Sequence, residues 1–406
     1  MRVPYQWVIV GVIWVSHTIY FLNYMTIGTL APLIKSELGI SSARIGLLSG
    51  AISIGSMVSQ IPVGALSDRF GAKWVMAAGL ILIGLSSVSI SAVSSYVVIF
   101  LLLVCLGAGI GANQTPGSKA IITWFPMKGR ATGMGIKQTG INMGGILASF
   151  LLPALALRFD TWRYPCALAG LAAIFTALLI FFVYRDPAQG AKVMGQGASG
   201  LRAASLLLLK NRDFLLVCGS GIFLMATQFA FATYFILYAS SELSFPLHKC
   251  GVLLGLAFLS GALGRIGWSM LSDYLFMGKR NSLLVIVGVA GALTCVGLVA
   301  LKGAGSSFLV YLSAIAFGLT GLGWNALYLT RVGELPGRDL AGIATGMAFV
   351  VSNIGAILGP PVFGYLVDVT GSYAVPWLFL GFCMAMVVLL SKLQGEERLT
   401  AEESYG

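Results

Sequence analysis

This chain of 406 residues contains few charged residues for its length. Asp, Glu, Lys and Arg make up 10% of it, whereas about 25% is usual in a soluble domain. The scarcity excludes a water-soluble globule, because too few polar side chains remain to cover its surface. The 58% of apolar residues and the mean hydropathy of +0.92 indicate that most of the surface faces lipid.

The sequence also lacks the patterns of a metal site or an enzyme active site. Its six cysteines and two histidines show no C-x-x-C or Cys/His spacing, so the cysteines are interpreted as small apolar packing residues. No nucleophile–base pair and no nucleotide-binding loop occurs. The net charge of +11 lies in short segments between apolar runs. We therefore expect no enzyme, no cofactor, no metal and no nucleic-acid partner.

What the sequence does contain is a series of apolar segments long enough to cross a bilayer, which takes about 20 helical residues. They predict an all-α membrane protein with twelve transmembrane helices, at 7–33, 45–66, 74–93, 96–118, 131–157, 162–184, 214–239, 250–271, 281–301, 307–329, 341–366 and 374–392. The main polar interruption predicts four parts: an N-terminal six-helix bundle at 1–184, a linker at 185–213, a second six-helix bundle at 214–392 and a tail at 393–406.

The basic residues predict the orientation of these helices. Lys and Arg are concentrated in the loops on the side that includes both termini and the linker. By the positive-inside rule, both termini lie in the cytoplasm. The first apolar run is too long for the apolar core of a cleavable signal peptide. We predict a multi-pass protein of a bacterial inner membrane that works as a monomer in the lipid bilayer.

Two pairs of similar segments relate the halves of the chain. G-A-L-S-D-R-F-G-A-K at 64–73 is echoed by S-M-L-S-D-Y-L-F-M-G-K-R at 269–280. N-M-G-G-I-L at 142–147 is echoed by N-I-G-A-I-L at 353–358. Both echoes are separated by about half the chain, so the second half is interpreted as a duplicate of the first. Duplicated six-helix halves are an architecture of secondary transporters.

The segment at 64–73 resembles the signature of the major facilitator superfamily. That resemblance implies two pseudo-symmetric six-helix bundles. Rocking of one bundle against the other would open a central site to each side of the membrane in turn. It also implies that Asp68 and Arg69, with Asp273 as the equivalent acid of the second half, are gating residues and not substrate ligands. The family often has an arginine in the fourth span where this chain has Leu103, so no mechanism that uses such an arginine is expected.

Lys137 and Arg265 lie inside predicted spans, where an ionisable side chain is expensive and therefore a functional candidate. All 14 acidic residues fall in loops, at span ends or in the tail, so no carboxylate is predicted to neutralise them. Neither cation has a charged counterpart in the other half. An anionic substrate would supply the missing charge. The alternative is that both side chains extend to the membrane surface.

Two further resemblances concern the kind of anion. G-R-I-G-W-S-M-L-S-D at 264–273 resembles the eighth span of the monocarboxylate and oxalate/formate branches, which implies that Arg265 binds a carboxylate. G-I-K-Q-T-G at 135–140 resembles the fifth span of cyanate-permease-like members. The sugar-acid branch usually has an arginine where this chain has Tyr24, and the nitrate branch has one where it has Gln60. These differences favour a small organic monoanion.

Several polar residues of the predicted spans complete the candidate site. His17 would lie near mid-membrane with Tyr20 and Tyr24 on the same helical face, and its side chain is a candidate to carry a co-transported proton. The alternatives are that the proton travels with the anion and that His17 is a packing residue. Further hydrogen-bonding candidates, each of which could instead join helices, are Asn113, Tyr234, Asn325 and Tyr328.

Together these residues predict a secondary transporter of a lactate-like monocarboxylate, by proton symport or anion exchange. Transport of cyanate- or nitrate-type anions and a nutrient sensor with a transporter fold are the alternatives.

Overall fold

The structure, a computed structural model, describes residues 5–125, 127–186, 205–277, 279–301, 307–336 and 340–394. No β-strand occurs in these ranges. The first-half helices are α1 (Tyr5–Tyr24), α2 (Thr26–Thr29), α3 (Ala31–Leu38), α4 (Ser42–Phe70), α5 (Ala72–Ser91), α6 (Tyr96–Trp124), α7 (Met127–Phe159) and α8 (Arg163–Val183). The second-half helices are α10 (Arg212–Ser241), α11 (Leu247–Tyr274), α12 (Arg280–Ala300), α13 (Ser307–Phe317), η1 (Gly318–Leu322), α14 (Asn325–Glu334), α15 (Ala341–Thr370) and α16 (Ala374–Lys392).

The predicted twelve-helix, all-α membrane fold is confirmed. Within the described ranges, eleven helical segments are long and apolar enough to cross a membrane, and one bent pair raises the number to twelve. That pair is α4, whose parts Ser42–Gln60 and Pro62–Phe70 meet at an angle of 50°. Proline inside a helix removes a backbone hydrogen bond and clashes with the preceding turn, which accounts for a bend at Pro62.

Two predicted spans are interrupted in the structure. The first, predicted at 7–33, ends as α1 at Tyr24 and continues through the short helices α2 and α3. Pro32 lies in the first turn of α3, where its missing N–H leaves no helical hydrogen bond unmade. The tenth, predicted at 307–329, contains the π-helix η1 between α13 and α14. A π-helix shifts the hydrogen-bonding partner by one residue and often marks a functional position.

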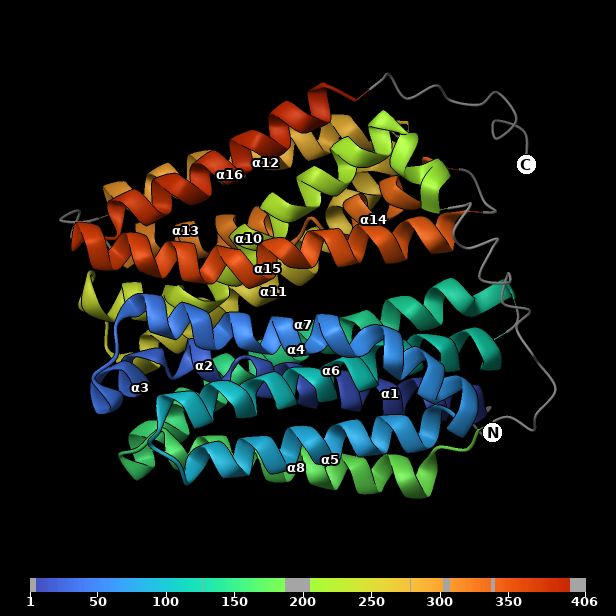
Figure 1. The fold of residues 1–406 in the computed structure, drawn as a ribbon. Coiled ribbons are helices and arrows are strands. Elements are labelled where there is room, and N and C mark those ends of the chain that lie inside the picture. Colours follow the sequence, from blue (N-terminus) through green and yellow to red (C-terminus); the bar gives the residue numbers. More distant parts are fainter. Residues whose placement is uncertain are drawn as a thin grey trace. The chain divides into compact units, whose positions relative to one another are not determined.

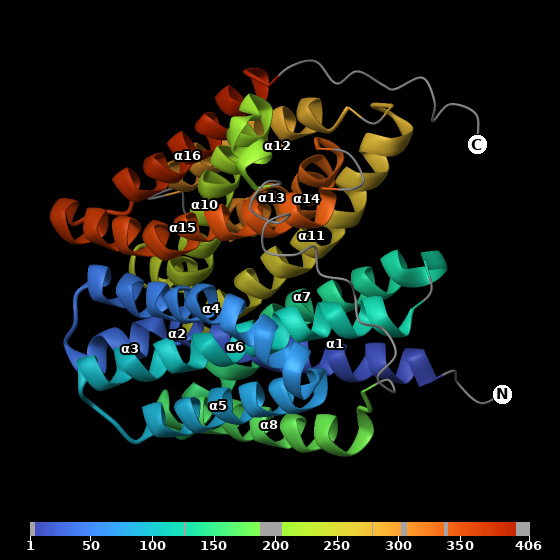
Figure 2. The same cartoon turned by 45° about the vertical axis from the view of Figure 1, so that its right-hand side comes forward.

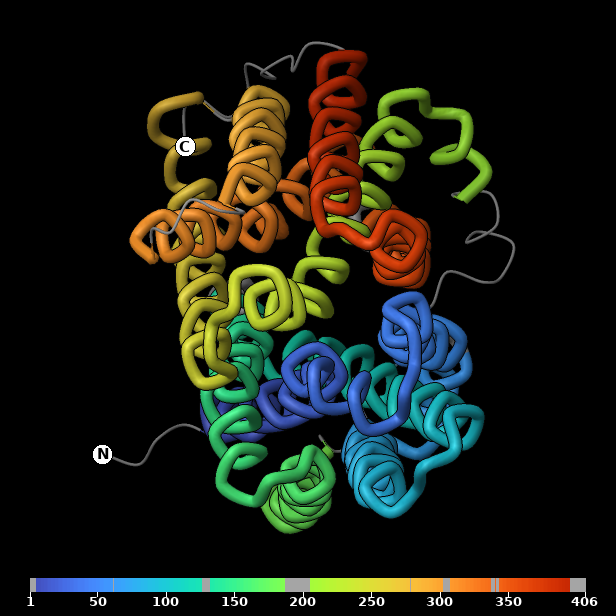
Figure 3. The backbone as a smooth tube through the Cα atoms, turned by 90° about the vertical axis from the view of Figure 1, so that its left-hand side faces the viewer, coloured from blue at the N-terminus to red at the C-terminus, as the bar shows by residue number. Residues whose placement is uncertain are grey.

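The chain divides into two compact units. Unit 1 comprises the described residues of Met1–Val193, Ala230–Phe258 and Pro360–Gly371, and unit 2 comprises those of Met194–Phe229, Leu259–Gly359 and Ser372–Gly406. In unit 1, α5 packs along α8, α4 along α6, and α1 along α7 (Figures 1 and 2). In unit 2, α12 packs along α16, as the end-on view shows (Figure 3).

The packing explains one of the sequence repeats. A Cβ atom placed at Gly144 of α7 would lie 2.4 Å from the Thr18 carbonyl oxygen of α1. In unit 2, a Cβ atom at Gly355 of α15 would lie 1.9 Å from the Ile222 carbonyl oxygen of α10. Both glycines are the third residue of their repeat, so the repeat encodes the same close contact of helix backbones in each unit. Small residues at such contacts are typical of membrane helices.

The predicted division into bundles, linker and tail stays a prediction. Of the linker predicted at 185–213, residues 187–204 lie outside the described residues, and of the tail predicted at 393–406, residues 395–406 do. The predicted orientation of the termini also stays a prediction.

Candidate substrate-binding site

Lys137 lies on α7 of unit 1 with only 3% of its surface exposed. Its Nζ atom donates a hydrogen bond of 2.5 Å to Ser118 Oγ of α6. Ser118 Oγ in turn donates to the Gln114 carbonyl oxygen, so it is a neutral partner. Within the described residues, no carboxylate forms an ion pair with Lys137. A buried ammonium without a counter-charge is costly, and an anion beside it would remove that cost.

His17 of α1 is completely buried, and it lies against α7 at Gly140, one helical turn from Lys137. Its Nδ1 atom is 3.0 Å from the Ile13 carbonyl oxygen, and because a carbonyl only accepts, Nδ1 carries the hydrogen. Nε2 is then an acceptor, and it is buried without a hydrogen-bond partner among the described residues. We call His17, Ser118 and Lys137 the Lys137 centre.

Glycines on two neighbouring helices make room for the His17 side chain. A Cβ atom placed at Gly117 of α6 would lie 3.1 Å from His17 Cε1, and one placed at Gly140 of α7 would lie 3.0 Å from His17 Cβ. Ser118 follows the first glycine directly, and Lys137 precedes the second by one helical turn. Three helices therefore meet at the histidine because two of them carry glycine there.

The other first-half candidates lie at different distances from this centre. The Tyr20 ring centroid is 4.8 Å from that of His17, so Tyr20 borders the centre. The Tyr24 hydroxyl is 3.3 Å from Ser53 Oγ on α4. Asn113 accepts a hydrogen bond from Ser16 and donates one to the Gly109 carbonyl oxygen, so both ends of its amide are occupied by protein groups.

Arg265 lies half-buried on α11 of unit 2, against the π-helix η1. Its Nε atom donates to the Leu322 carbonyl oxygen at 3.4 Å. One turn further along α11, Trp268 Nε1 donates to the Leu319 carbonyl oxygen at 2.7 Å. The π-helical backbone thus accepts hydrogen bonds from two side chains of α11, and these fix the position of the guanidinium group relative to η1.

Asn325 contacts the same Leu322 carbonyl oxygen that accepts the hydrogen bond from Arg265. Its Nδ2 atom is 3.5 Å from the Leu322 oxygen and donates a shorter hydrogen bond of 3.0 Å to Gln228 Oε1 on α10. We call Arg265, Gln228 and Asn325 the Arg265 centre. Sequence reasoning missed Gln228, although a glutamine within an apolar span is itself a signal of a polar role. Tyr328, in contrast, hydrogen-bonds Ser352 of α15 at 2.8 Å and is 1% exposed.

Tyr234 lies in a separate cluster of unit 1, at the start of α4. Its hydroxyl donates to the Ser42 carbonyl oxygen at 2.6 Å, and its ring stacks on Phe363 of α15. Asp368, also on α15, accepts hydrogen bonds from the backbone N–H groups of Ser42 at 2.8 Å and Ala43 at 2.7 Å. This cluster, the α4-start cluster, joins the beginning of α4 to the Pro360–Gly371 segment.

The predicted gating acids each pair with a cation of their own unit. Asp68 forms an ion pair with Lys119 of α6, and Asp273 forms one with Arg280 of α12. The guanidinium of Arg69 lies 5.2 Å from the ring centroid of the neighbouring Phe70. The two acids thus each pair within their own unit, but their partners are on helices that do not correspond, Lys119 on the fourth span and Arg280 at the start of the ninth. The role of the acids in gating stays a prediction.

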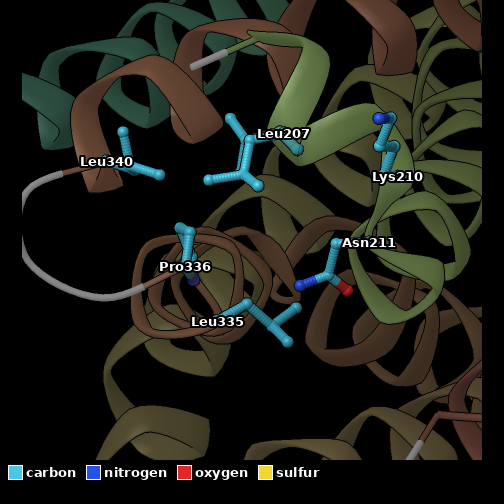
Figure 4. A pocket seen from close by; sticks show the side chains of 7 residues that line it. Leu207, Lys210, Asn211, Leu335, Pro336 and Leu340 are labelled. Atoms are coloured by element: carbon cyan, nitrogen blue, oxygen red, sulfur yellow. The ribbon is translucent and has the colours of Figure 1, made fainter. Parts of the chain in front are cut away.

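A pocket of about 400 Å³ lies elsewhere in unit 2 (Figure 4). Its lining is mostly aliphatic, with one lysine and one asparagine: Leu207, Leu208, Lys210, Asn211, Leu335, Pro336 and Leu340. None of the candidate residues lines it, so it is not the site described above.

Comparisons with known proteins agree with this architecture. The family model of the Major Facilitator Superfamily matches residues 13–360. The hexuronate transporter of Bacillus subtilis is 24% identical over 384 residues, which cover 91% of this chain and 90% of the transporter. A probable sulfoacetate transporter of Cupriavidus necator is 24% identical over 407 residues, with coverages of 96% and 94%. A solved bacterial homologue of the human lysosomal transporter Spinster, inward-facing and unoccupied, has a TM-score of 0.79 at 16% identity, with coverages of 97% and 98%.

Proposed function

This chain belongs to the major facilitator superfamily, and we propose that it carries a small organic anion across the membrane by alternating access. The observation that supports the anion is Lys137, buried with a neutral partner and with no carboxylate paired to it among the described residues. A bound anion would compensate that charge. Two relatives, a hexuronate transporter and a probable sulfoacetate transporter, are named as carriers of organic acids.

The substrate that we propose is a carboxylate of the lactate-like monocarboxylate class. Arg265 supports a carboxylate, since a guanidinium can donate two parallel hydrogen bonds to its two oxygens. The absence of an arginine at Tyr24 favours a monoanion over a sugar acid, whereas the hexuronate transporter among the relatives favours a hydroxylated acid. A hydroxylated monoanion such as lactate satisfies both.

His17 is the proposed proton carrier if transport is symport. Its Nε2 atom is a buried acceptor without a hydrogen-bond partner among the described residues, and this is the atom that would bind a transported proton. If no proton is carried, anion exchange is the remaining mechanism. We place the protein, as a monomer, in a bacterial inner membrane.

Uptake of labelled lactate into proteoliposomes tests the proposal. We expect Lys137→Ala and Arg265→Ala to reduce uptake at least about 10-fold, because each removes a charge-assisted hydrogen bond of about 1.5–3 kcal/mol. Arg265→Lys should also impair uptake, since an ammonium cannot reproduce the planar pair of donors. Lys392→Ala, at an exposed position at the end of α16, is the matched control and should keep wild-type uptake.

Two outcomes would contradict the proposal. Wild-type uptake in both cation variants would remove the electrostatic argument. Inhibition of transport by cyanate or nitrate, with no effect of lactate or acetate, would replace an organic anion with an inorganic one. An imposed pH gradient then distinguishes symport from exchange, because it drives symport and leaves exchange unchanged.

A further inference from the structure

We infer that Gln228 and Asn325 bind a hydroxyl group of the substrate beside Arg265, so that the transported acid is a hydroxycarboxylate. This inference rests on the proposed function, because it takes Arg265 as the group that holds the carboxylate. It goes further in adding Gln228 to the site and in assigning the recognition of the substrate hydroxyl to the two amides.

The geometry of unit 2 places the two amides next to the arginine. The Leu322 carbonyl oxygen accepts from both Arg265 Nε and Asn325 Nδ2, at 3.4 and 3.5 Å. The two nitrogens can therefore be no farther apart than the sum of these distances. Asn325 Nδ2 also donates to Gln228 Oε1 at 3.0 Å, which joins α10 to the start of α14. Gln228 is 7% exposed, so its orientation is constrained by its surroundings.

The amides of Gln228 and Asn325 leave one donor group and one acceptor atom available. With Asn325 donating to Gln228, the Nε2 group of Gln228 and the Oδ1 atom of Asn325 have no hydrogen-bond partner within the described part of the chain. The contact of Asn325 Nδ2 with the Leu322 carbonyl oxygen supports this orientation, because a reversed amide would set two acceptor oxygens against each other. A hydroxyl group matches it, because a hydroxyl both donates and accepts.

Other substituents match the pair less well. A second carboxylate only accepts hydrogen bonds, so it would be repelled by the amide carbonyl oxygen of Asn325. A methyl or methylene group would leave the donor and the acceptor without partners when water is excluded. A hydroxyl on the carbon next to the carboxylate keeps both groups within the upper limit that the shared Leu322 carbonyl sets between Arg265 and Asn325. The site therefore favours a 2-hydroxycarboxylate over the corresponding unsubstituted acid.

Binding of matched acids to the purified full-length transporter tests the inference. The probes are lactate against propionate, and gluconate against 2-deoxygluconate, which differ by one hydroxyl within each pair. We expect the wild-type protein to bind the hydroxylated member about 10- to 100-fold more tightly, from the loss incurred by unpaired polar groups. Gln228→Met and Asn325→Leu, which keep the side-chain size, should abolish this preference and should bind propionate at least as tightly as the wild-type protein, because the amides that propionate leaves unpaired are gone.

A neighbouring polar residue supplies the control. Thr227 donates to the Phe223 carbonyl oxygen within its own helix, so Thr227→Val should keep the preference for lactate. A monodisperse elution profile and propionate binding no weaker than that of the wild-type protein show that each variant is folded. Equal binding of lactate and propionate by the wild-type protein would overturn the hydroxyl assignment and leave the proposed function intact. Absence of binding and uptake for all four acids would overturn the proposed function itself.

Discussion

The carboxylate of Asp368 should be a main stabilising contact of the α4-start cluster. Its two oxygens accept from two successive backbone N–H groups at the first turn of α4, at 2.8 and 2.7 Å. These groups have no partner inside the helix, and a negative charge there also interacts favourably with the helix dipole. Losing a side-chain cap costs about 0.5–2 kcal/mol, and the charge adds about 0.3–1 kcal/mol. We expect Asp368→Ala to lower the free energy of unfolding by about 1–2 kcal/mol.

SDS titration of the purified protein in mixed micelles measures this loss. Asp368→Asn keeps one carbonyl acceptor and should lose about half as much. Asp186 offers a comparison within unit 1, because it accepts from Ala72 at 3.0 Å and from Lys73 at longer distances. Its alanine variant should therefore be less destabilised than Asp368→Ala. Equal stability of Asp368→Ala and the wild-type protein would show that water replaces the carboxylate without loss, and would refute the reasoning.

Three further predictions concern unit 2. Gly355→Ala should destabilise by about 1–3 kcal/mol in the same titration, since its Cβ would overlap the α10 backbone, whereas Gly346→Ala on the same helix meets nothing within 4 Å and should be neutral. Tyr328→Phe should cost about 1 kcal/mol, because it leaves the buried Ser352 hydroxyl without its tyrosine partner; an unchanged titration would contradict this. Trp268→Phe should raise the KM for carboxylate uptake several-fold with a smaller effect on kcat, because η1 would hold α11 less firmly; equal changes in both would contradict it.

The sequence was sufficient to predict the number and kind of the helices. Their apolar lengths reflect the thickness of the bilayer, which acts on each segment separately. The repeat at 142–147 and 353–358 was visible in the same way, and its glycines now have a shared packing role. Lys137 and Arg265 could be selected because a charge in an apolar span is conspicuous whatever the helix packs against.

The hydrogen-bond partners of the candidate residues could not be predicted. Tyr234 and Tyr328 are similar in sequence context, yet one hydroxyl contacts a backbone carbonyl at the start of α4 and the other a serine of α15. The π-helix η1 was also invisible, since a sequence of Gly, Leu and Thr suits a regular helix or an irregular one. Both features depend on neighbouring helices, and hydropathy carries no information about which helices are neighbours.

Three helices pass from one unit into the other, and this has a mechanical consequence. α10 crosses between Phe229 and Ala230, α11 between Phe258 and Leu259, and α15 between Gly359 and Pro360. At the third crossing, Pro360 and Pro361 have no N–H groups, so two of the backbone hydrogen bonds of the helix cannot form. α10 and α11 have no proline at their crossings. α15 therefore crosses between the units with two fewer backbone hydrogen bonds than a helix without proline could form.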